Sequence, residues 1–220
     1  MYSFAQRSDT RVVDEPFYAY YLMLTGKDHP GRAEVLKTQS HDLDAVFENL
    51  AHLEDTEVLF IKNMAKHLET IPTNLFKAYT HLLLIRDPAQ IITSFVKGYP
   101  NPKMEDIGMA YQFALYAFFV KHGYPFVVLD SNEVLKSPQR VLSQLCERLG
   151  IPFDTAMLSW EPGARPEDGS WAKHWYHRVH KSSGFLASSS ATPQLPDHCV
   201  PLYEEARPFY EALYLHALKA

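Results

Sequence analysis

The fold class follows from one stretch of sequence, His81-Leu82-Leu83-Leu84-Ile85-Arg86-Asp87-Pro88. Residues 81–85 form a run that is apolar on both faces, which is typical of a central strand in a parallel sheet covered by helices on each side. Asp87 is a favourable helix N-cap and Pro88 suits the first helical position. The stretch therefore predicts a buried strand with a helix directly after it.

Other runs rich in β-branched residues or leucine extend this pattern in both directions along the chain. They occur at residues 11–13, 58–61 and 125–129, and stretches with helical periodicity separate them. This alternation predicts an α/β fold in which a parallel sheet is the middle of three layers.

The rest of the chain divides into expected helices and one irregular segment. We expect helices over residues 104–122, 138–149 and 203–218, and Gly150 ends the second of these. Residues 159–201 lack periodicity but are rich in tryptophan and other aromatic residues. We interpret them as an irregular, aromatic-rich loop that folds over the active-site side of the sheet.

Composition limits the class of protein. The 220 residues, 46% of them hydrophobic, are enough for one core, so a single domain over residues 1–220 is expected. A net charge of −5 argues against a nucleic-acid partner. No apolar run is long enough to span a membrane and no signal peptide is evident, which favours a cytoplasmic protein without a membrane partner. Cys146 has helical spacing with leucines and is expected to be a buried thiol, not a disulfide partner of Cys199.

Arg86 and Ser94 form the strongest candidate binding pattern. Arg86 is expected at the carboxyl end of a parallel strand, where open α/β sheets bind ligands, and Ser94 in the helix that follows. A guanidinium offers donors that match phosphate oxygens, and a helical hydroxyl adds another. On the alternative interpretation, Arg86 forms an ion pair and Ser94 lies on the helix surface.

Arg86-Asp87-Pro88 with Ser94 resembles the 3′-phosphate-binding motif of PAPS-dependent sulfotransferases. Residues 127–130 and 137–152 are similar to that family's next strand, helix and Leu-Gly-x-Pro stretch, and residues 171–185 to a loop of its bacterial small-substrate members. The resemblance implies a fold of the P-loop nucleoside-triphosphatase-like type, PAPS as donor, PAP as product and no metal. It also implies nucleotide contacts from Ser182, Ser183 and the backbone of Gly184, although Ser-Ser-Gly is also an ordinary turn sequence.

Two further strand ends carry candidate catalytic residues. Glu15 follows the first expected strand and resembles the glutamate proposed as base in several sulfotransferases; Asp14 is an alternative base, and a capping or lysine-paired acid is the structural interpretation. Lys62 ends another strand and could neutralise charge on the sulfuryl group or the leaving phosphate. Met64 stands where cytosolic members have a catalytic histidine, so His67 is a second candidate base.

The family begins with a strand and a loop for the 5′-phosphosulfate, whereas residues 1–7 resemble the remainder of the helix after that loop. We therefore expect an N-terminally truncated form. Two functions stay open: transfer of a sulfuryl group from PAPS to a hydroxyl or amine of a small organic acceptor, or a catalytically inactive descendant that binds PAP or a partner. A nucleotide kinase is disfavoured because no Gly-x-x-x-x-Gly-Lys-Ser/Thr sequence occurs. The sequence predicts no oligomeric state.

Overall fold

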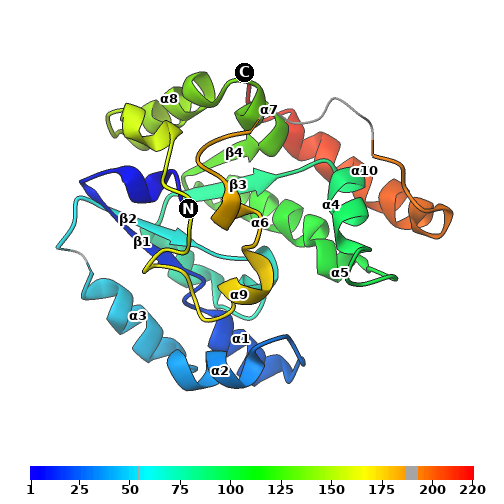
Figure 1. The fold of residues 1–220 in the computed structure, drawn as a ribbon, viewed down its shortest axis with the longest axis horizontal. Coiled ribbons are helices and arrows are strands. Elements are labelled where there is room, and N and C mark those ends of the chain that lie inside the picture. Colours follow the sequence, from blue (N-terminus) through cyan, green and yellow to red (C-terminus); the bar gives the residue numbers. More distant parts are fainter. Residues whose placement is uncertain (54, 187–192) are drawn as a thin grey trace. The chain divides into compact units, whose positions relative to one another are not determined.

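Parallel strands form the centre of each of the two compact units into which the chain divides (Figure 1). The computed structural model describes residues 1–53, 55–186 and 193–220. The first unit comprises Met1–Ile71 and Asp154–Leu186, and the second comprises Pro72–Phe153 and Ala187–Ala220. The single domain expected from the sequence stays a prediction.

In the first unit, strand β1 (Thr10–Asp14) pairs in parallel with β2 (Val58–Lys62), so that Asp14 lies opposite Lys62 at their carboxyl ends. The helices of this unit are α1 (Tyr18–Thr25), α2 (Arg32–Thr38), α3 (Leu43–Ala51), α9 (Ala172–Trp175) and the 3-10 helices η1 (Phe4–Gln6), η2 (Ala65–Leu68), η4 (Thr155–Leu158) and η5 (Val179–Lys181). A buried cluster joins α1 and α2 to the later segment through Tyr18, Leu22, Val35 and Trp171. The apolar face of α1 thus anchors a part of the chain that is about 150 residues away in sequence.

In the second unit, β3 (His81–Ile85), β4 (Phe126–Asp130) and β5 (Ala217–Leu218) form a parallel sheet in that order. Its helices are α4 (Pro88–Phe95), α5 (Met104–Ile107), α6 (Met109–His122), α7 (Ser131–Lys136), α8 (Pro138–Leu149), α10 (Val200–Tyr214) and the 3-10 helices η3 (Thr73–Ala78) and η6 (Asp197–Cys199). Helix α10 packs on β3 and β4 and also contacts α4 and α6. A helix from the end of the chain therefore packs on β3 and β4. The buried central strand expected over 81–85 is wrong, because β3 lies at the edge of this three-stranded sheet and Leu84 is 57% exposed.

Several expectations are confirmed at the level of single residues. The fold is α/β with parallel strands, as the alternating pattern predicted. Asp87 caps α4 by accepting a hydrogen bond from the backbone N–H of Ala89 at 2.8 Å, with Pro88 in the first turn. Gly150 ends α8 with a φ of 71°, a left-handed conformation that glycine adopts without strain. Both cysteines are free and buried.

Two expected helices were wrong in extent. The helix expected over 104–122 is interrupted at Gly108, whose φ of 66° ends α5 and precedes α6. The helix expected over 203–218 ends at Tyr214, and Ala217 and Leu218 instead form β5 beside β4. The pairing of β5 with β4 explains this difference. It satisfies backbone groups along the edge of β4 that would stay unpaired if the helix continued to residue 218.

Two irregular regions contain short helices. The segment expected as a loop over 159–201 includes α9, η5, η6 and the start of α10, and its residues 187–192 lie outside the described residues. Residues 1–7, expected as the remainder of a helix, form a single helical turn closed by an Ala5 N–H to Met1 carbonyl bond of 3.1 Å together with η1. In the part of the chain that the structure describes, no helix combines the length and apolar character needed to cross a membrane.

Candidate functional site

Glu15 lies directly after β1 in a conformation that is rare for its residue type. Its φ is 45°, in the left-handed region that non-glycine residues seldom occupy. Its N–H donates to the Lys62 carbonyl at 2.7 Å, and its own carbonyl accepts from the Tyr18 N–H at 3.1 Å and from Gln39 Nε2 at 3.2 Å. Hydrogen bonds to three elements therefore hold a strained turn, which is a common feature of functional sites.

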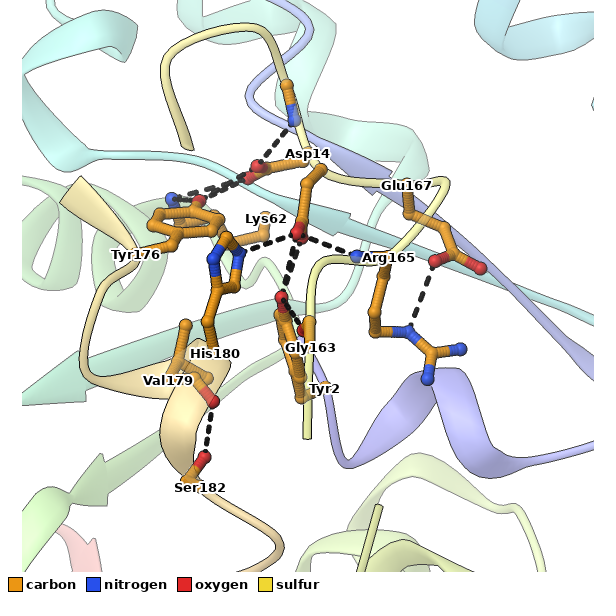
Figure 2. A network of polar contacts seen from close by, with 12 residues as sticks. Tyr2, Asp14, Lys62, Gly163, Arg165, Glu167, Tyr176, Val179, His180 and Ser182 are labelled. Atoms are coloured by element: carbon orange, nitrogen blue, oxygen red, sulfur yellow. Dashed lines mark hydrogen bonds and ion pairs between the residues drawn. The ribbon is translucent and has the colours of Figure 1, made fainter. Parts of the chain in front are cut away.

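The side chains at the ends of β1 and β2 form a charge cluster with buried carboxylates, and Figure 2 shows Asp14 and Lys62 of this cluster. Lys62 Nζ contacts Glu15 Oε1, lies 3.3 Å from Asp14 Oδ1 and donates to the Tyr176 hydroxyl at 2.8 Å. The side chains of Asp14 and Glu15 are 0% and 5% exposed, whereas that of Lys62 is 25% exposed. Of the three charged side chains, Lys62 is thus the most accessible to a ligand.

The environment of Glu15 changes its acidity. Burial raises the pKa of its carboxyl group above the ordinary value, while attraction to Lys62 opposes this shift. A glutamate with a raised pKa is a stronger base than an exposed one. The cluster therefore joins a candidate base to a neighbouring cation at one strand end.

His67 lies beside Glu15 but is enclosed. Its Nδ1 is 3.5 Å from Glu15 Oε2, its ring stacks on Tyr18 with centroids 4.4 Å apart, and its side chain is 1% exposed. Burial lowers the pKa of His67 to about 2, with Lys66 and Lys62 adding to the effect, so the imidazole is neutral. Both side chains are buried, so the opposite pKa shifts favour Glu15 over His67 as the base, and the roles of both residues stay predictions.

A second network fastens the aromatic-rich segment to the start of the chain (Figure 2). The Asp168 carboxylate accepts from the Tyr2 hydroxyl at 2.8 Å, from His180 Nε2 at 2.9 Å and from the Arg165 N–H at 2.9 Å. Neither Asp168 nor Tyr176 was singled out as a functional candidate by the sequence analysis. The aromatic density around Tyr176 and the resemblance of residues 171–185 to a sulfotransferase loop pointed to this segment but to neither residue.

The residues expected to contact nucleotide in the first unit have local partners. The Ser182 hydroxyl donates to the Val179 carbonyl at 2.7 Å and accepts from Trp160 Nε1 at 3.1 Å. Ser183 is exposed, and its carbonyl accepts from the Trp160 N–H at 3.1 Å. A Cβ on Gly184 would lie 3.0 Å from the Leu158 carbonyl oxygen, a tight contact, so glycine suits the close backbone packing here. Nucleotide contacts from these three residues stay a prediction.

Arg86 and Ser94 belong to the second unit. Arg86 follows β3 and is exposed, and its Nε donates to Gln90 Oε1 at 2.9 Å. Gln90 Nε2 in turn donates to Asn132 Oδ1 at 3.2 Å, which links the helices that follow β3 and β4. Ser94 lies exposed on α4. Both predicted phosphate ligands are therefore accessible to solvent on neighbouring elements.

Among residues 1–53, 55–186 and 193–220, no group of three or more His, Cys, Asp or Glu side chains could hold a metal ion. The charge cluster around Lys62 contains its own cation, so its carboxylates have a counter-charge.

Comparison with known proteins identifies the family through a family model. A family model described as a sulfotransferase domain matches residues 1–217. Branched-chain-amino-acid aminotransferase-like proteins 1 and 2 of Arabidopsis thaliana are 37% and 36% identical over 218 residues, which are 98% of this chain. The chain spans 39% of the length of these two relatives.

A solved structure supports the fold. The sulfotransferase domain from the curacin biosynthetic pathway matches with a TM-score of 0.52 at 20% identity, over 89% of this chain and 77% of that domain.

Proposed function

We propose, from the premise that this chain belongs to the sulfotransferase domain family, that it transfers a sulfuryl group from PAPS to a hydroxyl or amine of a small organic acceptor. The observation that carries the proposal is the contact between Glu15 and Lys62 at the carboxyl ends of two adjacent parallel strands. PAPS would supply the activated sulfuryl group, and PAP would be released. The chain's own residues would bind and orient the substrates and would accept a proton from the acceptor.

The second unit offers groups that suit the 3′-phosphate of PAPS. Arg86 is an exposed guanidinium at the end of β3, and its Nε is oriented by Gln90. A guanidinium donates to phosphate oxygens in a fixed fork geometry. The exposed hydroxyl of Ser94 on α4 can add a further donor. We assign these two residues to nucleotide binding.

Glu15 is the residue we assign to proton removal. Its buried carboxylate would accept the proton of the acceptor hydroxyl or amine, and its raised pKa matches that task better than an ordinary glutamate would. Lys62 is the residue we assign to charge neutralisation, since its Nζ lies at the same strand end and is partly exposed. An ammonium placed in advance costs no reorganisation when charge develops.

The plant relatives do not identify the acceptor. Their name describes proteins that are much longer, because this chain spans 39% of their length. The acceptor class is instead proposed from the resemblance of residues 171–185 to a loop of bacterial small-substrate sulfotransferases.

The proposed function is tested by measuring nucleotide binding and transfer on the same protein. Calorimetry with PAP measures binding, and radiolabelled PAPS with a panel of small phenols, alcohols and amines measures transfer. Binding of PAP together with transfer to one or more acceptors is expected, and Glu15→Gln is expected to bind PAP but transfer poorly. Binding without transfer would support the inactive PAP-binding alternative, and absence of binding would reject both.

A further inference from the structure

The Tyr176 hydroxyl lies between the Asp14 carboxylate and the Lys62 ammonium at the strand ends (Figure 2). It donates to the Asp14 carboxylate, with oxygen–oxygen distances of 2.9 and 2.8 Å, and accepts from Lys62 Nζ at 2.8 Å. Tyr176 follows α9, and 162 residues separate it from Asp14. A side chain from the aromatic-rich segment thus completes the cluster formed by β1 and β2.

Asp14 depends on this hydroxyl because its side chain is completely buried. The other contacts that the structure describes for its carboxylate are longer, at 3.3 Å from the Gly169 N–H and 3.3 Å from Lys62 Nζ. A buried carboxylate without sufficient donors is strongly unfavourable. If the Tyr176 hydroxyl were absent, Lys62 would be the nearest charge able to compensate Asp14.

We propose that Tyr176 is a positioning residue for the transfer reaction, and that by donating to Asp14 it keeps the Lys62 ammonium on Glu15. The inference rests on the proposed function for its catalytic meaning. The division of Lys62 between two carboxylates is, however, a property of the protein alone. Tyr176 acts through Asp14 and Lys62 and needs no contact with substrate.

The segment that carries Tyr176 is well anchored, as a positioning role requires. Trp171 is 2% exposed and packs edge-on against Tyr18, with ring centroids 5.2 Å apart. Lys173 pairs with Glu34 of α2. These contacts fix α9 against α1 and α2, so the Tyr176 hydroxyl reaches the cluster from a rigid support.

The groups that face Glu15 determine the expected effect. They are Asp14 on β1, Lys62 on β2, Lys66 and His67 on η2, and Tyr176 after α9. Burial is the largest influence and raises the pKa of Glu15, Lys62 and Lys66 lower it, Asp14 raises it, and His67 is neutral. If Lys62 moves toward Asp14, Glu15 loses its main counter-charge and its pKa rises further.

The test compares two tyrosines that make the same kind of bond. Tyr2 donates to the buried Asp168 at 2.8 and 3.0 Å, but its partner carboxylate contacts His180 and Arg165 instead of Lys62. Tyr176→Phe and Tyr2→Phe therefore each remove one tyrosine–aspartate bond from the first unit. Carbon-13 NMR of glutamate carboxyls, with the Glu15 signal identified by its loss in Glu15→Gln, measures the titration without substrate.

We expect the Glu15 titration to move upward by about one pH unit in Tyr176→Phe and to stay in place in Tyr2→Phe. The acidic limb of kcat should move in the same direction in Tyr176→Phe. An unchanged or lowered Glu15 titration in a folded Tyr176→Phe protein would overturn the inference. If the shift occurs but the parent protein transfers no sulfuryl group, the proposed function fails while the control of Lys62 by Tyr176 stands.

Asp14→Asn provides a second test, also when Tyr176→Phe does not fold. It removes the carboxylate that competes for Lys62, so the Glu15 titration should move downward. Adding Tyr176→Phe to Asp14→Asn should then produce no further shift, because no competing charge is left. A full upward shift from Tyr176→Phe in the Asp14→Asn background would contradict the competition. Failure of Asp14→Asn to move the Glu15 titration would contradict it as well.

Discussion

The carboxyl ends of the parallel strands differ between the two units. In the first unit, Lys62 contacts both Asp14 and Glu15, and both carboxylates are buried. In the second unit, Arg86 and Ser94 are exposed, and the Arg86 Nε bond goes to the neutral side chain of Gln90. Charges that are buried together have altered acidity, whereas an exposed guanidinium keeps its charge and its directional donors. The first arrangement suits proton transfer, and the second suits capture of a phosphate.

Glu15→Gln is the variant with the largest expected effect on this difference between the two units. The amide keeps the size of the side chain but cannot accept a proton, so we expect kcat to fall by about 10²- to 10⁴-fold. PAP affinity, assigned to the second unit, should stay unchanged. Steady-state kinetics and calorimetry measure the two quantities on the same preparation.

His67→Phe is the matched control for Glu15→Gln. It removes both ring nitrogens while keeping a flat ring against Tyr18, and we expect kcat to stay within about tenfold of the parent value. Equal losses of kcat in the two variants would refute the assignment of Glu15 as the base.

Arg86→Ala tests the second unit with the next largest effect. Loss of a charge-assisted contact to phosphate should weaken PAP binding about ten- to hundredfold. Arg148→Ala removes an exposed arginine from α8 and controls for the change in net charge. Calorimetry that finds the same PAP affinity in Arg86→Ala and the parent would remove Arg86 from the nucleotide site.

The pH dependence of turnover should reflect the ionisation of Glu15 in the first unit. Glu15 must be ionised to accept a proton, and burial raises its pKa above the ordinary value of 4.5. Activity is therefore complete at pH values above the raised pKa and falls as the pH drops through it, by about tenfold per unit at saturating substrates. The acidic limb should lie above pH 4.5 and disappear in Glu15→Gln. A limb at or below 4.5 in the parent would mean that burial does not control this carboxylate.

The sequence predicted much of this arrangement because strand ends leave local signals. Asp14-Glu15, Lys62 and Arg86 each follow a short apolar run, so their location at carboxyl ends was expected and is confirmed. The left-handed backbone of Glu15 was not foreseen, because this conformation is usually signalled in a sequence by glycine and a glutamate gives no such signal. Tyr176 was missed as a partner of Asp14 because the contact joins residues 162 positions apart. The two-residue strand β5 is too short to show a period.

The smallest expected effect concerns Gln90, and it tests whether the exposed site is also oriented in advance. Gln90 accepts from Arg86 Nε at 2.9 Å and donates to Asn132 at 3.2 Å, so it connects the arginine to the helix after β4. Asn132 is held in turn by its N–H bond to Asp130 at 2.9 Å. Gln90→Ala removes this connection without removing charge.

Gln90 only orients the guanidinium, so its loss should cost about 0.5–1.5 kcal/mol, the net contribution of a typical intramolecular hydrogen bond, and PAP binding should weaken about two- to tenfold in Gln90→Ala. Because Gln90 acts through the guanidinium, the effect should vanish in the Arg86→Ala background, where no side chain is left to orient. Calorimetry on the two single variants and the double variant measures this coupling. If Gln90→Ala weakens binding equally with and without Arg86, Gln90 contacts the nucleotide itself. The orientation of the Arg86 guanidinium would then not depend on Gln90. The exposed strand end of the second unit would bind phosphate without a side chain oriented in advance.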